Sequence, residues 1–129
     1  MQIHQSAEDY LETILMLTQR MGRVRSIDVV NELGYTKASV SIAMKKLREN
    51  GYIAVAGEGN LTLLDPGREI AERIYSRHRL LTHFFIQLGV DEKTAAEDAC
   101  KAEHILSEQT LEKIRESALR NDATHPQAK

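Results

Sequence analysis

A second cysteine and a long apolar run are both absent from this 129-residue chain, in which Cys100 is the one cysteine. A lone cysteine cannot form an intrachain disulfide, which favours a reducing compartment. No apolar run approaches the roughly 18 residues that a membrane-spanning helix requires. The first residues, Met1–His4, do not begin the charged and then apolar pattern of a signal peptide. We therefore expect a soluble cytoplasmic protein of one compact unit or two small ones, with no membrane association.

A strong excess of charge of one sign is also absent, since the net charge is −2. The charge is nevertheless uneven along the chain. Residues 20–55 contain seven basic and three acidic residues, a balance of +4, whereas the chain from Leu80 contains six basic and nine acidic residues, a balance of −3. A basic segment followed by an acidic one indicates an anion-binding module joined to a second part. Charge alone would favour the simpler explanation of ordinary solvated helix faces.

The spacing of apolar residues predicts a mainly helical chain. Helices are expected over residues 6–21, 26–33 and 36–50, then from 65 to about 88, from 91 to about 106, and from 107. The expected N-caps are Ser6, Ser26, Thr36, Asp65, Asp91 and Ser107. The inner face of the 26–33 helix is expected to carry Ile27, Val30 and Leu33. Two short apolar segments around Gly57–Asn60 predict a β-hairpin, and residues 121–129 predict a frayed polar tail in which His125 is a bystander.

Two short helices joined by a turn that contains Gly34, followed by a hairpin, predict a winged helix-turn-helix. The second helix of such a unit enters the DNA major groove. Hydroxyl groups near its start can approach phosphates and base edges, and basic side chains neutralise phosphates. The hairpin tip is poor in basic residues because it contains Glu58. A unit used only for protein contacts is the alternative. The candidate DNA-binding residues are Arg25, Thr36, Lys37, Ser39, Ser41, Lys45 and Lys46.

A second group of residues has the chemistry of a metal site. Cys100, Glu103 and His104 occupy positions i, i+3 and i+4, which places them on one face of a helix. Asp9 and Glu12 also share a helix face, and thiolate, carboxylate and imidazole are all ligands of divalent transition metals.

All but one of these residues also have an ordinary explanation. Asp9 would be the capping partner of Ser6, and a buried cysteine usually behaves as a small apolar residue. A histidine at position 78, on an inner helix face, usually bonds to a backbone carbonyl. Glu12 has no such explanation, because it lies within the apolar pattern of its helix.

The segments "EDYLETILML", "SRHRLL" and "ACKAEHILS", together with the helix-turn-helix, resemble the iron- and manganese-dependent repressors of the diphtheria toxin repressor and MntR group. The resemblance extends from about Ser6 to Ile114. It implies a mainly α protein with a winged helix-turn-helix domain at 1–64, a linking helix at 65–79, a helical metal-binding and dimerisation domain at 80–120 and a tail at 121–129. The SH3-like domain of larger members is expected to be absent.

Carried over residue by residue, the resemblance implies six metal ligands: Asp9, Glu12, His78, Cys100, Glu103 and His104. Asp9 and Glu12 match the manganese-responsive branch, whereas Cys100 matches the iron-responsive branch. Thr82 and Ala96 stand where the iron branch has ancillary ligands. The expected metal is Fe²⁺ or Mn²⁺, with Co²⁺, Ni²⁺ or Zn²⁺ able to substitute in vitro.

The function expected from these features is metal-dependent repression of metal-uptake genes by a homodimer on a palindromic double-stranded DNA operator. No small organic ligand is expected. In this hypothesis, metal between the DNA-binding and dimerisation parts fixes the spacing of the two recognition helices. Two alternatives remain at this point: a winged-helix regulator that senses oxidation at Cys100 without metal, and a metalloenzyme that uses Glu12 as its base.

Overall fold

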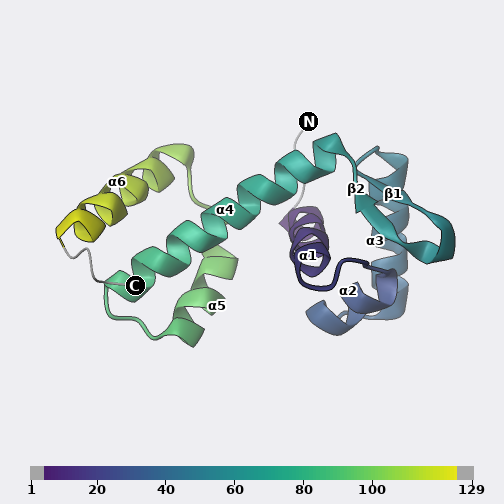
Figure 1. Ribbon diagram of the computed structural model, residues 1–129, viewed down its shortest axis with the longest axis horizontal. Helices are drawn as coiled ribbons and strands as arrows, with labels where there is room; N and C mark the ends of the chain where they lie inside the picture. The colour runs from purple at the N-terminus through teal and green to yellow at the C-terminus, as the bar shows by residue number, and fades with distance from the viewer. Residues whose placement is uncertain (1–4, 125–129) are drawn as a thin grey trace. The chain divides into compact units, whose positions relative to one another are not determined.

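The computed structural model describes residues 5–124 as a mainly helical chain with one small hairpin (Figure 1). Its elements are α1 (Gln5–Met21), α2 (Ser26–Leu33), α3 (Lys37–Glu49), β1 (Ile53–Val55), β2 (Leu61–Leu63), α4 (Asp65–Gln87), α5 (Glu92–Ala102) and α6 (Glu108–Thr124). The chain forms two compact units, and the boundary between them falls inside α4, after Arg73. Among the residues described, no helix combines the length and apolarity needed to cross a membrane.

Helix α1 supplies much of the core of the first unit. Leu11, Ile14 and Leu17 are fully buried, as the helical spacing of the apolar residues predicts. The predicted N-cap at Ser6 is wrong, because Ser6 already lies inside the helix. Asp9 therefore cannot be the third residue of a capping box that starts at Ser6. Gly22 follows the last helical residue with a φ of 87°, a left-handed conformation that glycine adopts at low cost.

Helices α2 and α3 form the helix-turn-helix. Thr36 is the N-cap of α3, as predicted, and its side-chain oxygen accepts a hydrogen bond from the Ser39 N–H at 3.1 Å. The N-cap of α2 is Arg25 rather than Ser26, because the Asp28 carboxylate accepts a hydrogen bond from the Arg25 N–H. The predicted inner face of α2 is only partly correct: Val30 and Leu33 are half-buried, but the fully buried residue of this helix is Val29, which was not predicted to face inward.

The outer residue of α2 and the inner face of α3 show how the two helices pack. Ile27 is exposed, since a helix of two turns packs only a narrow stripe against its neighbours. Val40, Met44 and Leu47 are buried on the inner face of α3, which confirms that part of the prediction.

The predicted hairpin is confirmed. Strands β1 and β2 pair antiparallel, with Ile53 opposite Leu63 and Val55 opposite Leu61. The backbone N–H of Leu61 also donates a hydrogen bond of 2.7 Å to the Val24 carbonyl, just before α2. The hairpin is thereby fixed to the helix-turn-helix by both backbone hydrogen bonding and apolar burial.

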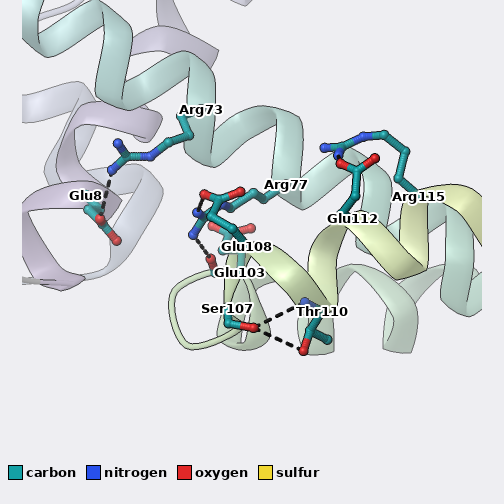
Figure 2. Close-up of polar contacts among 9 residues, drawn as sticks. All are labelled: Glu8, Arg73, Arg77, Glu103, Ser107, Glu108, Thr110, Glu112 and Arg115. Atoms are coloured by element: carbon teal, nitrogen blue, oxygen red, sulfur yellow. Dashed lines mark hydrogen bonds and ion pairs between the residues drawn. The ribbon is translucent and has the colours of Figure 1, made fainter.

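The first turns of α4 belong to the first unit. Helix α4 begins at Asp65, so this residue is part of the helix and not the predicted cap before it. Gly67 approaches the backbone of Tyr52 so closely that the position has no space for a Cβ atom. Arg73 forms an ion pair of 3.5 Å with Glu8 of α1 (Figure 2).

The second unit contains the rest of α4 with α5 and α6, and both of these helices lie alongside α4 in Figure 1. Leu81, Ala99 and Leu111 form its buried centre, one from each helix. Asp91 caps α5 as predicted: the Thr94 N–H donates to its carboxylate and holds the pKa of Asp91 below its usual value.

Helices α5 and α6 both end at places that differ from the prediction. Helix α5 stops at Ala102, about one turn earlier than predicted. Helix α6 continues to Thr124, so the frayed tail predicted from residue 121 is wrong for 121–124, and His125 lies outside the described residues. Asp122 explains the longer α6, because its carboxylate accepts a 2.7 Å hydrogen bond from Gln87 and lies 3.1 Å from Nε2 of His83.

Candidate metal centre and nucleic-acid interface

A fully buried carboxylate, that of Glu103, lies at the centre of the polar cluster in the second unit. Its Oε1 is 2.9 Å from Nδ1 of His78, and its Oε2 is 3.4 Å from Nε2 of His104. The His104 side chain is only 1% exposed. Each oxygen of one buried carboxylate thus faces an imidazole nitrogen.

Two helices and one turn bring these three side chains together. His78 projects from α4 between the buried residues Ile74 and Leu81. Glu103 is the C-cap of α5 and keeps helical backbone angles, and His104 follows in the turn. Thr82, one turn beyond His78, donates its hydroxyl proton to the His78 carbonyl at 2.7 Å, so its hydroxyl is engaged with the backbone of α4.

Arg77 explains why α5 ends where it does. Its guanidinium donates a 3.2 Å hydrogen bond to the Glu103 carbonyl, which a longer helix would have offered to the N–H of residue 107 (Figure 2). The same guanidinium is ion-paired with the carboxylate of Glu108 at the start of α6. Ser107 can then leave the helical conformation and cap α6, where its Oγ accepts from the Thr110 N–H.

Sequence reasoning missed Arg77. Its side chain is only 15% exposed, whereas arginine side chains in proteins are mostly exposed. The contact with Glu108 spans 31 residues of sequence, and no helical periodicity connects two residues so far apart. The one feature of the sequence that could have indicated a role for Arg77 is its position directly before His78, a predicted ligand.

Two of the predicted ligands, Asp9 and Glu12, lie in the first unit, one turn apart on α1. Glu12 is only 5% exposed, as its place in the apolar pattern predicts, and Asp9 is half-buried. A buried carboxylate is costly unless it is paired, hydrogen-bonded or bound to a cation. Burial also raises the pKa of Tyr10, the neighbour of Asp9.

Cys100 lies on α5 with an exposed side chain. The prediction that Cys100, Glu103 and His104 share one face of a continuous helix is only partly correct, because α5 ends before His104. The helical angles of Glu103 keep it one turn beyond Cys100, while His104 is placed by the turn instead. Exposure also removes the explanation of Cys100 as a buried apolar residue.

The donor set of the second unit fits a divalent transition metal. Imidazole nitrogens and a carboxylate suit Mn²⁺, Fe²⁺ and Zn²⁺, and an additional thiolate favours the softer members of that series. Carboxylates and imidazoles bind a metal in their deprotonated forms, so metal binding by such a cluster is coupled to the release of protons. The cluster therefore has both the residue types and the burial of a metal centre.

The seven candidate DNA-binding residues are all exposed in the first unit. Thr36 and Ser39 are joined by a 2.9 Å hydrogen bond between their hydroxyls in the first turn of α3. Lys45 and Lys46 follow on the outer side of the same helix. This side of α3 therefore carries hydroxyl groups near its start and positive charge farther along.

Arg25 occupies a position that sequence reasoning did not foresee. Its side-chain carbons lie against Gly59 at the tip of the hairpin, because a Cβ at Gly59 would be 3.7 Å from Cδ of Arg25. The hairpin tip contains Glu58 and has no basic residue of its own. Arg25 therefore brings a positive charge to the wing from the cap of α2.

Replacing Arg77 with alanine should weaken metal binding by the second unit about tenfold, because groups that hold metal ligands in place typically contribute 10- to 100-fold. Metal affinity measured by competition with a fluorescent chelator gives this value. Arg115→Ala is the matched control, since Arg115 pairs with Glu112 on the surface of α6 and contacts no predicted ligand. Equal affinities for the two variants would contradict the role of Arg77, and Arg77→Lys should recover part of the loss.

Comparisons with known proteins cover nearly the whole chain. Residues 2–61 match the profile "Iron dependent repressor, N-terminal DNA binding domain", and residues 65–127 match "Iron dependent repressor, metal binding and dimerisation domain". An uncharacterized HTH-type transcriptional regulator of Methanocaldococcus jannaschii is 36% identical over 113 residues, which are 86% of this chain and 90% of that protein. MntR of Bacillus subtilis is 34% identical over 109 residues, covering 84% of this chain and 77% of MntR.

Solved structures have the same fold. A manganese-dependent transcriptional repressor in complex with manganese is 28% identical, with a TM-score of 0.79 over 87% of this chain and 52% of that one. IdeR of T. acidophilum, 22% identical, has a TM-score of 0.79 over 91% of this chain and 55% of that chain. The chain therefore spans about half the length of these solved relatives.

The metalloenzyme alternative is set aside, since both matching profiles describe parts of a transcriptional repressor. The two profiles correspond to the helix-turn-helix with its hairpin and to the helices that hold the buried carboxylate. With its DNA-binding domain and its metal-binding and dimerisation domain, this chain belongs to the iron-dependent repressor family, the DtxR and MntR group of metal-dependent transcriptional repressors.

Proposed function

We propose that this chain is a cytoplasmic repressor of metal-uptake genes, which binds a palindromic operator as a homodimer when Fe²⁺ or Mn²⁺ is abundant. The observation that carries the proposal is the buried Glu103 carboxylate with an imidazole nitrogen near each oxygen. The proposed metal ligands are Asp9, Glu12, His78, Cys100, Glu103 and His104. The proposed DNA-binding residues are Arg25, Thr36, Lys37, Ser39, Ser41, Lys45 and Lys46.

A bound divalent cation would supply positive charge to its carboxylate, thiolate and imidazole ligands. The residues themselves perform the remaining tasks. Glu103 provides a carboxylate whose burial excludes water, and Arg77 fixes the turn that carries Glu103 and His104. A metal can favour the DNA-binding conformation only if it binds that conformation more tightly than the alternatives.

The DNA-binding side of the proposal is supported by the surface of α3. Lys45 and Lys46 would neutralise phosphates, and the hydroxyls in the first turn would approach the backbone or base edges. The dimer is supported by three large apolar side chains of the second unit that are exposed in the single chain, Leu88, Ile105 and Leu119. Apolar residues of this kind gather at homodimer interfaces.

The exposure of Cys100 also favours the redox alternative, because oxidation sensors use solvent-accessible thiols. The two functions make opposite predictions for Cys100→Ser in the presence of EDTA. A redox sensor without metal keeps its DNA affinity in EDTA and loses its response to peroxide. A metal-dependent repressor has no DNA affinity in EDTA, whichever residue stands at position 100.

The experiment that tests the proposed function is an anaerobic DNA-binding titration of the wild type with Mn²⁺, Fe²⁺, Co²⁺ and Zn²⁺, and with EDTA as the metal-free arm. The DNA is an operator selected from random duplexes with the metal-loaded protein. We expect tight binding to it with Fe²⁺ and none in EDTA. Operator affinity that does not change in EDTA would overturn the proposal. Cys100→Glu should shift the ranking of metals toward Mn²⁺, because a hard carboxylate replaces a soft thiolate; an unchanged ranking would show that Cys100 does not determine metal choice.

A further inference from the structure

Ile42 is the most exposed large apolar residue among the described residues of the first unit, with 59% of its surface accessible. It lies in the middle of α3, two residues after Val40 and two before Met44, both of which are buried. Successive helical residues are about 100° apart, so Ile42 lies about 200° from each of them. It therefore occupies the centre of the side of α3 that faces away from the core.

The helical neighbours of Ile42 on that side are mostly polar, with the exposed Ala38 as the exception, and Ile42 also borders a hollow lined in part by Ala7 and Tyr10 of α1. Ser39 lies one turn before it, and Lys45 and Lys46 lie one turn after it, all exposed. A branched apolar side chain at the centre of such a surface would gain free energy if a partner removed it from water. The two lysines favour a polyanionic partner, and a partner that also presents an apolar group would use both the lysines and Ile42.

Double-stranded DNA has such a group in its major groove. The 5-methyl of thymine is the one apolar substituent that base pairs present there, and it distinguishes A·T from the other pairs by contact alone. Lysine and serine side chains on this surface cannot make that contact well, and Ala38, which is also exposed there, offers only a single methyl group. Resting on the proposed function, we propose that Ile42 is a specificity-determining residue that reads thymine through its 5-methyl group in each half-site of the operator.

The test begins by selecting the preferred operator from random duplexes with the metal-loaded wild-type protein. Each thymine of that operator is then replaced by deoxyuridine, which removes only the methyl group. We expect one position in each half-site at which the replacement weakens binding by roughly fourfold, the value of one buried methylene-sized group. At that position, Ile42→Ala should weaken binding to the thymine operator and abolish the difference between thymine and deoxyuridine.

Ile27→Ala is the matched control, because it removes the same atoms from an exposed isoleucine of α2. It should leave both the affinity and the response to deoxyuridine unchanged. Thermal unfolding of both variants checks the fold, which truncation of an exposed side chain should preserve. A thymine effect that persists in Ile42→Ala, or no thymine effect at all, overturns this inference alone. Failure of the wild type to bind any duplex with any of the four metals overturns the proposed function as well.

Discussion

Glu103→Gln is expected to abolish metal-dependent operator binding, lowering the apparent metal affinity by more than about a hundredfold, the upper range for loss of a group that only supports a ligand. The substitution keeps the shape of the side chain and removes the charge that lies between His78 and His104. An amide binds divalent transition metals poorly, and its NH₂ group would face one of the two imidazole nitrogens. DNA binding is expected to fall to the level that the wild type shows in EDTA.

The measurement pairs a chelator-competition assay for the metal with a fluorescence anisotropy assay for the operator. Glu97→Gln is the matched control, since Glu97 is an exposed carboxylate on the same helix, and it should leave both affinities unchanged. Thermal unfolding in EDTA separates loss of metal binding from loss of fold. A Glu103→Gln protein that folds and still binds its operator only in the presence of metal, with wild-type affinity, would show that Glu103 is not a ligand.

Gly67→Ala is expected to destabilise the protein by about 1 to 3 kcal/mol, the usual range for overpacking. The new Cβ would overlap the carbonyl oxygen of Tyr52 and lie 3.0 Å from its carbonyl carbon. That carbonyl cannot move freely, because it accepts a 3.0 Å hydrogen bond from Leu64 and the Tyr52 N–H donates to the Leu47 carbonyl. The clash outweighs the gain of about 1 kcal/mol that alanine gives over glycine in a helix.

Urea denaturation followed by circular dichroism measures the free energy of unfolding for the variant and the wild type. Gly57→Ala is the control, because its Cβ would meet nothing within 4 Å and its φ is not left-handed. That control should change the free energy of unfolding by less than about 0.5 kcal/mol, as substitutions at open surface positions usually do. Equal stability of the two variants would mean that the Tyr52 backbone yields at little cost.

The parts of the fold that could be predicted from sequence are those that local chemistry determines. Thr36 caps α3 because a hydroxyl can accept the orphan N–H of Ser39, and that interaction lies within four residues of sequence. Gly34 takes a φ of 73° at the end of α2, a conformation that favours glycine wherever it occurs. The hairpin follows from two apolar segments on either side of a glycine-rich turn.

The parts that could not be predicted depend on contacts between distant residues. The end of α5 depends on Arg77, which binds a carbonyl 26 residues away. The length of α6 depends on Asp122, which contacts His83 and Gln87 on α4. At the candidate site, burial of Glu12 followed from the apolar pattern of α1, whereas the exposure of Cys100 did not follow from any pattern in α5.

The position of Arg25 determines how the charge at the wing responds to changes in the hairpin. Its backbone is held by Asp28 at the start of α2, and its side-chain carbons lie against the hairpin tip. The positive charge beside the wing is thus encoded outside the hairpin. A change in the hairpin sequence would therefore alter the shape of the wing without removing this charge, whereas loss of the Asp28 carboxylate would release the backbone that carries it.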